Sequence, residues 1–145
     1  MANWMVVMTE DNFKISQKYS LIGVSESRKV SLMSMKKGDG LVFYISRKKI
    51  GQRGTSGRVC EFGGIGKVIG EACESQNPIW NTVGDITFPY RRKVEITPAK
   101  QRVQVTEMLN SLDFLVGKKK WGGFFLQSLR KISDKDFETI KNAIL

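Results

Sequence analysis

The chain has 145 residues, of which 41% are hydrophobic and 26% are charged, and its 24 Lys and Arg residues exceed its 14 Asp and Glu residues by ten. This length predicts one globular domain spanning residues 1–145 with one core. Histidine is absent and only two cysteines are present. This excludes histidine-based catalysis and the ordinary structural zinc sites, so we expect neither a metal nor a cofactor.

The first part of the chain alternates apolar runs with short polar segments. Asn3–Met8 is an apolar run that predicts a buried strand. Thr9 is a good N-cap, and Glu10 and Asp11 suit the start of a helix over residues 10–18. In chain order we then expect a short loop or extended piece at 20–27, a brief helical turn at 28–35, a glycine turn at 36–40 and a second buried strand at 41–46.

The middle of the chain is rich in glycine. Residues 47–64 hold several glycines and five basic residues, which predicts a long cationic loop that either grips a ligand or only connects two strands. A strand is expected at 65–73, where Gly66 and Gly70 indicate a bulge or a close backbone approach. A loop at 74–85 follows, and then a strand at 87–97 in which Pro89 fits only an edge or a bulge.

The last part of the chain is predicted to be mostly helical. Short helices are expected at 106–112 and 124–131, on either side of a basic loop at 117–123. The final helix has the clearest start, because Ser133 and Asp136 have capping-box spacing, and it turns Phe137, Ile140 and Ile144 inward. Together these elements predict a mixed α+β fold, with a curved sheet closed into a small partial barrel and flanked by helices.

The net charge of +10 predicts an anionic partner. Nucleic acid, either RNA or DNA, is the first candidate, because Lys and Arg gain affinity by releasing the counterions of phosphates. A membrane surface is not expected, since we find no basic amphipathic helix with an exposed apolar face and no lipidation signal. A merely solvated basic surface is the alternative.

Cys60 and Cys73 are the only cysteines, and no secretory segment precedes them. We therefore expect reduced thiols in a cytoplasmic protein, with a Cys60–Cys73 disulfide as the alternative.

Trp80 is the aromatic residue that most strongly suggests a binding site, because the sequence NPIWN places it in a loop between two strands. An indole ring can stack on a base or attract a cationic group. The alternative is that Trp80 covers one end of the core. Trp4 lies in an apolar strand and is expected in the core, whereas Trp121 fits either role.

Two short basic runs are further candidates for binding. Residues 118–123, KKKWGG, combine cations, an aromatic ring and glycines just before an expected helix, where free N–H groups could meet a phosphate. In Arg91-Arg92-Lys93 the side chains alternate along a strand, so Arg92 points away from the other two. Each run is alternatively a solvated face.

Catalytic patterns are scarce in this sequence. It contains no paired carboxylates, nucleophile elbow, P-loop or dinucleotide fingerprint. An enzyme stays open as an alternative, with Thr9, Glu10 or Glu71 near a lysine. An accessory subunit whose basic face meets an acidic protein is a third hypothesis.

The order of several short motifs resembles the EVE domains of the PUA-like superfamily, which are related to the YTH domains that read methylated adenine. The matching pieces are the Trp4 strand running into residues 9–13, Gly23-Val24, Lys37-Gly38-Asp39, Phe88-Pro89-Tyr90-Arg91, Lys120-Trp121 and Phe124-Phe125. The resemblance spans nearly the whole chain and implies a small β-barrel flanked by helices. Some relatives hydrolyse modified nucleosides, which keeps the enzyme alternative open.

The resemblance implies a pocket at the mouth of the barrel that takes one flipped-out, often modified base. Asn12 would bond the base, Gly23 and Val24 would supply backbone contacts, and Trp80 would form an aromatic wall. Ile22 departs from the pattern, because these families usually have a tryptophan there. The expected base pocket comprises Thr9, Asn12, Ile22, Gly23, Val24 and Trp80. The residues expected to hold the nucleic-acid backbone are Arg28, Lys48, Lys49, Arg53, Arg58, Arg91, Lys118, Lys119 and Lys120.

Overall fold

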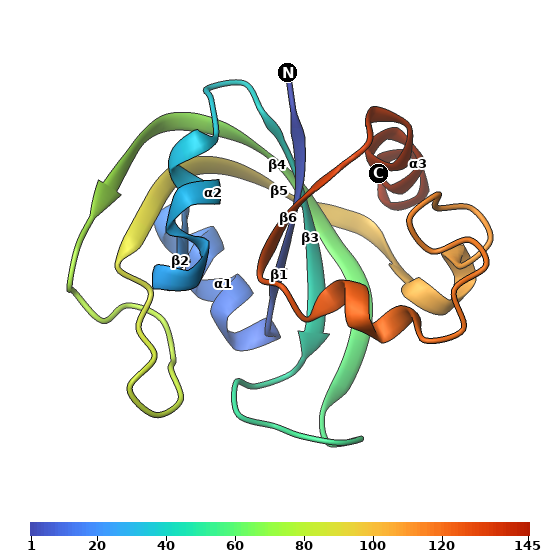
Figure 1. Cartoon of the computed structure of the whole chain (residues 1–145), viewed down its shortest axis with the longest axis horizontal. Coiled ribbons are helices and arrows are strands. Elements are labelled where there is room, and N and C mark those ends of the chain that lie inside the picture. The colour runs from blue at the N-terminus through green and yellow to red at the C-terminus, as the bar shows by residue number, and fades with distance from the viewer.

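A computed structural model describes all 145 residues of the chain. Six strands form one curled sheet, and three α-helices and short 3-10 turns lie around it (Figure 1). The strands are β1 (Asn3–Met8), β2 (Leu21–Val24), β3 (Gly40–Arg47), β4 (Arg58–Glu74), β5 (Tyr90–Gln104) and β6 (Leu129–Ile132). The helices are α1 (Glu10–Tyr19), α2 (Lys29–Ser34) and α3 (Asp134–Ile144), and none is long and apolar enough to cross a bilayer.

The sheet has the order β2-β5-β4-β3-β1-β6 and forms a half-barrel, which confirms the predicted α+β fold and partial barrel. β1 and β3 are parallel, with Trp4 opposite Leu41, and all other neighbours are antiparallel. β2 and β6 are the two open edges. The carboxyl ends of β1 and β3 therefore meet at the same end of the molecule, where each chain segment leaves the sheet.

Alternate side chains of the central strands enter two separate cores. Trp4 and Val6 of β1 pack on the side of α1, β2 and α2, whereas Met5 packs on the side of α3. Trp4 is only 3% exposed and its indole Nε1–H donates to the Asp39 carboxylate at 3.0 Å, as its core position predicted. On the other side Phe137, Ile140 and Ile144 of α3 are buried, and Ser133 accepts the Asp136 N–H at 3.1 Å, so the predicted last helix is confirmed.

The predicted loop at 47–64 is wrong over its second half. The loop covers only residues 48–57, because β4 begins at Arg58, which pairs with Arg47 of β3. Of the five glycines in this segment, Gly63 and Gly64 lie inside this long strand, where the register shifts between Phe62 and Gly64. A Cβ atom at Gly64 would lie 3.0 Å from the carbonyl oxygen of Thr97, so close strand packing at a bulge accounts for the glycine.

The predicted helix at 124–131 is also wrong. A 3-10 helix, η3 (Trp121–Phe125), precedes β6, which pairs with β1 so that Leu129 lies opposite Val6. The free edge of β1 offers hydrogen-bond partners to this segment, and strand pairing outweighs its local helix propensity. The other predicted short helix is reduced to η2 (Val105–Met108).

Candidate functional site

A cavity of about 780 Å³ opens where β1 and β3 end. These ends of the two strands lie in the lower part of the view in Figure 1. Its rim is formed by the 48–57 loop, by the 75–89 loop and by residues 119–128. Its floor is apolar and includes Val6, Met8, Tyr44 and Phe125. The parallel pairing of β1 and β3 thus brings three distant segments of the chain together around one hollow.

Trp80 forms one end of this cavity. Its indole Nε1–H donates to the Ser16 hydroxyl at 3.0 Å, and the Arg91 guanidinium lies 5.1 Å from the centre of the ring. Phe88 packs edge-on at 6.2 Å between ring centres. The side chain is 7% exposed yet still lines the cavity. Trp80 is therefore a fixed wall that both covers one end of the core and faces the hollow.

Gly23 lies against this wall on β2. A Cβ atom at this position would come within 2.4 Å of Trp80, so only glycine fits. The Val94 N–H donates to the Ser20 carbonyl at 3.0 Å, so Ser20 and Val94 form a hydrogen-bonded pair at the start of the β2–β5 ladder. Hydrogen-bonded and non-hydrogen-bonded pairs alternate along an antiparallel ladder, and the pair of Gly23 and Arg91 is three positions further along. Gly23 consequently falls on an unbonded position, and its N–H and C=O point to the free edge of β2. The backbone of Val24, by contrast, bonds to Tyr90 in the ladder.

Asp11 and Asn12 fasten the loop that carries Trp80. The Asn12 side chain accepts from the Asn81 N–H at 2.8 Å and donates to the Asn81 carbonyl at 2.9 Å. The Asp11 carboxylate accepts from the Asn81 side chain at 2.8 Å and from the hydroxyl of Thr9. Burial opposes ionisation of Asp11, but these hydrogen bonds outweigh it and lower its pKa. Both polar groups of Asn12 are thus already used within the chain.

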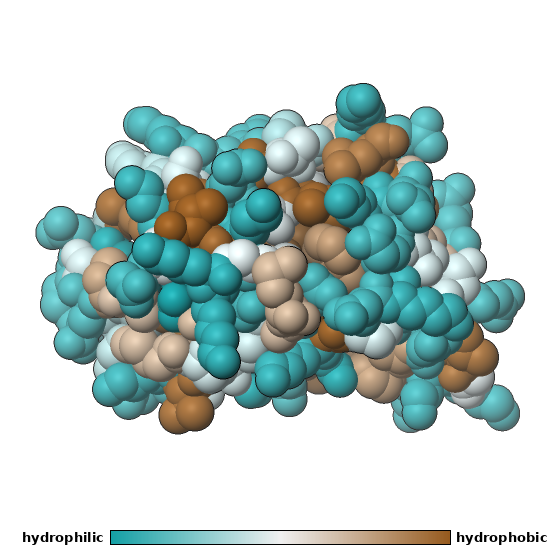
Figure 2. Space-filling view, turned by 90° about the horizontal axis from the view of Figure 1, so that it is seen from above, coloured by the Kyte–Doolittle hydropathy of each residue, from teal (hydrophilic) through white to brown (hydrophobic).

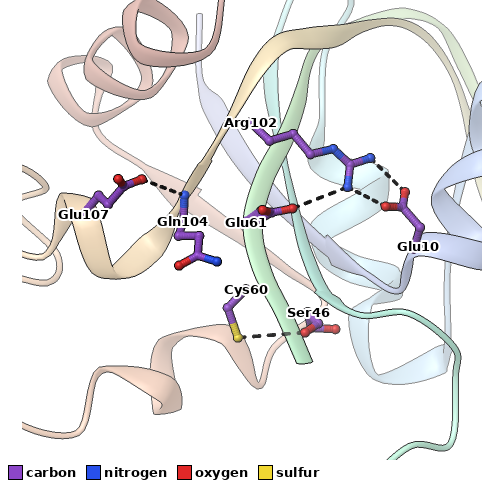
Figure 3. Close-up of polar contacts among 7 residues, drawn as sticks. All are labelled: Glu10, Ser46, Cys60, Glu61, Arg102, Gln104 and Glu107. Carbon is purple, nitrogen blue, oxygen red and sulfur yellow. Dashed lines mark hydrogen bonds and ion pairs between the residues drawn. The ribbon is translucent and has the colours of Figure 1, made fainter. Parts of the chain in front are cut away.

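Arg102 holds the start of α1, and with it Asp11 and Asn12, against the sheet. Its guanidinium donates twice to the Glu10 carboxylate and lies 3.7 Å from Glu61 (Figure 3). The bond from Arg102 lowers the pKa of Glu10. The same view shows the Cys60 thiol next to the Ser46 carbonyl at 3.9 Å, at the edge of the cavity. Both cysteines are free.

The other end of the cavity is formed by Trp121 and its neighbours. Trp121 is half-buried and packs edge-on against Phe125, at 6.1 Å between ring centres. Phe125 stacks on Tyr44 at 3.9 Å. Burial raises the pKa of the Tyr44 phenol, so it stays neutral.

Four basic side chains line the cavity: Arg47, Arg58, Lys119 and Lys120. None of the four makes an ion pair, and no carboxylate lines the cavity. The hollow is therefore electropositive. Arg47 donates to the Ser56 carbonyl at 2.9 Å and was missed by sequence reasoning, although it directly follows the predicted strand at 41–46.

The structure brings several of the expected pocket residues together but not all. Thr9, Asn12, Gly23 and Trp80 line the cavity, whereas the side chains of Ile22 and Val24 are buried in the core and face away from it. Arg91 is buried and donates to the carbonyls of Phe88 and Asn77, so it holds the 75–89 loop and is not free for a ligand. Of the expected cations, Arg28, Lys48, Lys49, Arg53 and Lys118 lie outside the lining.

The acid–lysine pair considered for an enzyme is not assembled in the cavity. Glu10 pairs with Arg102, and Glu71 lies 4.0 Å from Lys37 on the exposed surface. Neither acid lines the cavity. The face seen from above in Figure 2, at the other end of β1, is mostly hydrophilic with separate hydrophobic patches.

The half-barrel fold is also found in other solved structures. Rpa0253 from Rhodopseudomonas palustris superposes with a TM-score of 0.63 at 14% identity, covering 98% of this chain and 92% of that one. The Pho92 YTH domain in complex with m6A superposes with a TM-score of 0.64 at 12% identity, covering 99% and 82%.

The model of the EVE domain family matches residues 2–143, and the chain belongs to that family. It is 29% identical to a UPF0310 protein of Pyrococcus abyssi, over 99% of this chain and 100% of the relative. It is 27% identical to a UPF0310 protein of Mesorhizobium japonicum, over 99% and 91%.

Proposed function

We propose that this chain is a nucleic-acid-binding domain that captures one base, unmodified or modified, beside Trp80. The observation that carries this proposal is a single cavity with an indole wall, an apolar floor, four unpaired cations and no carboxylate. A base needs an apolar, flat-walled slot, and its phosphates need cations close by. The net charge of +10 supports the same partner class.

Two of the structural neighbours support the proposal. One is the Mmi1 YTH domain, solved as a complex with RNA, and the other is the Pho92 YTH domain, solved as a complex with m6A. Both share this fold at low identity, 8% and 12%. The proposal for this chain therefore rests on its own cavity, and these neighbours only add to it.

Gly23 is the residue best suited to read the edge of the captured base. Its N–H and C=O face the free edge of β2 at the Trp80 end of the cavity, and together they offer one donor and one acceptor. Asn12 has the right chemistry, but it contacts a base only after releasing Asn81. We therefore assign Asn12 and Asp11 to holding the Trp80 loop, and the base edge to Gly23.

The test is a titration of fluorescein-labelled single-stranded RNA and DNA hexanucleotides, followed by fluorescence anisotropy. Trp80→Ala is expected to weaken binding by about tenfold or more, since stacking on an aromatic ring contributes about 1–3 kcal/mol per base. Tyr19→Ala removes an exposed aromatic ring outside the cavity and serves as the matched control. Circular dichroism checks that both variants are folded. The proposal would be contradicted if the wild type and a folded Trp80→Ala variant bound with equal affinity. It would also be contradicted if salt did not weaken binding.

A further inference from the structure

The cavity is larger than a single base requires. Its volume of about 780 Å³ lies in the upper part of the range of about 300–1,000 Å³ that holds drug-sized ligands. The proposed base site uses only the end beside Trp80, Gly23 and Ser16. The end beside Trp121 is left without an occupant.

This second end has its own aromatic wall. Trp121 is held by Phe125, which is stacked in turn on Tyr44, so the three rings form a continuous packed group. Trp121 stays half-buried and lines the cavity. An indole fixed on one side and open on the other is suited to stacking on a flat ligand.

Two glycines next to Trp121 leave space above the backbone. Cβ atoms added to Gly122 and Gly123 would meet no atom within 4 Å, and neither residue has a positive φ. Neither packing nor backbone conformation therefore calls for glycine here. Both residues line the cavity. Glycines at such positions allow a ligand to approach the main chain closely.

The cations gather at this end from two different segments. Lys119 and Lys120 precede Trp121, and Arg47 and Arg58 come from the facing hairpin of β3 and β4. Three basic residues elsewhere in the chain, Lys37, Arg102 and Lys135, are paired with carboxylates. The four at the cavity have no such partner, so an anion held between the two segments would meet cations on both sides.

We propose that the Trp121 end is a second nucleotide subsite, which stacks the base next to the captured one and binds the phosphate that joins them. This inference rests on the proposed function and narrows its ligand to a strand of at least two nucleotides. A free nucleoside or mononucleotide would fill only the Trp80 end.

The experiment measures the affinity of the full chain for a mononucleotide, a dinucleotide and a hexanucleotide of the same single-stranded RNA, by isothermal titration calorimetry. The wild type is expected to gain about tenfold or more from mononucleotide to dinucleotide. Trp121→Ala is expected to lose this gain and to keep the mononucleotide affinity. Gly123→Leu removes no contact and fills the open space above the backbone, so it is expected to have the same effect in a chain that remains folded.

Lysine variants of the same loop supply a matched control. Lys120→Ala removes a cation that lines the cavity and is expected to weaken the dinucleotide selectively, whereas Lys118→Ala removes a neighbouring cation outside the lining and is expected to have no effect. A dinucleotide that binds folded Gly123→Leu and Trp121→Ala as well as the wild type would overturn the second subsite alone. Failure of every length to bind the wild type would overturn the proposed function and this subsite with it.

Discussion

Trp80 and Trp121 stand at the two ends of one cavity but are held in different ways. Trp80 is 7% exposed and is fixed by a hydrogen bond to Ser16, by the guanidinium of Arg91 and by contact with Gly23. Trp121 is half-buried, packs edge-on against Phe125 and lies beside two glycines with empty space above them. The first end is prebuilt and closely packed, and the second is open and charged.

Because of this difference, the two ends should contribute to the binding free energy in different ways. A rigid wall has already lost its conformational freedom on folding, so a ligand that meets it loses little entropy there. An open, cationic surface contributes mainly through phosphates and depends on salt. We therefore expect the Trp80 end to decide which base is held and the Trp121 end to decide how tightly a strand is held.

The largest expected effect on the free energy of unfolding comes from removing each indole ring in turn. Trp80→Ala is expected to lower the free energy of unfolding by about 3–5 kcal/mol, as for other buried aromatic side chains. Trp121→Ala is expected to cost clearly less, because Trp121 is less buried than Trp80 and part of its surface is already in water. Urea unfolding at neutral pH, followed by circular dichroism, measures both. Equal losses would show that the two ends are packed alike and would break the comparison.

Adding one methyl group at each end tests the same contrast with a smaller change. Gly23→Ala forces its Cβ against Trp80, which is expected to cost about 1–3 kcal/mol of stability. Gly122→Ala meets open space and is expected to be neutral or to stabilise the chain by up to about 1 kcal/mol, because alanine restricts the unfolded chain. Urea midpoints of the two variants give opposite signs if the packing is as described. A destabilised Gly122→Ala would contradict the open space at the Trp121 end.

Much of the fold follows from local patterns in the sequence. The apolar run at 3–8, the acidic start of the helix after Thr9, and the cap at Ser133 each predict an element that the structure contains. The segment at 58–64 was misjudged because its glycines serve a bulge between two neighbouring strands. β6 was misjudged because its partner, β1, lies more than a hundred residues away.

The site was harder to predict than the fold for the same reason. Trp80 stands out in a loop, and its role as a wall could be anticipated. The pairing of Asn12 with Asn81 joins residues 69 positions apart, and no local pattern marks it. Arg91 looks like a surface cation in the sequence, yet the 75–89 loop folds over it and uses its donors.

The loop that carries Trp80 should respond to acid through Asp11. Hydrogen bonds hold the folded-state pKa of Asp11 below its ordinary value of 3.8. Its contribution to stability is therefore complete above the unfolded-state pKa and is lost as the pH falls through the lower pKa of the folded state. Asp11→Asn is expected to flatten the acid limb of a plot of stability against pH. Glu138→Gln, at an exposed acid on α3 without an ion pair, is the charge-matched control. An unchanged acid limb in Asp11→Asn would show that this carboxylate does not hold the loop.

The smallest expected effect concerns single cations at the rim of the cavity. Arg58, the first residue of β4, lines the cavity, and Arg53 lies outside it in the adjoining 48–57 loop, so the two arginines of this hairpin form a matched pair. If Arg58 contacts a phosphate, Arg58→Ala should reduce the slope of log K against log salt by about 0.7 for a single strand. Arg53→Ala should leave the slope unchanged, and anisotropy titrations over a series of salt concentrations compare the two. Equal changes would mean that the loop attracts nucleic acid only through its overall charge. A change confined to Arg58 would place a phosphate inside the cavity, because both variants lose the same charge from the same hairpin and only the Arg58 side chain lines the hollow.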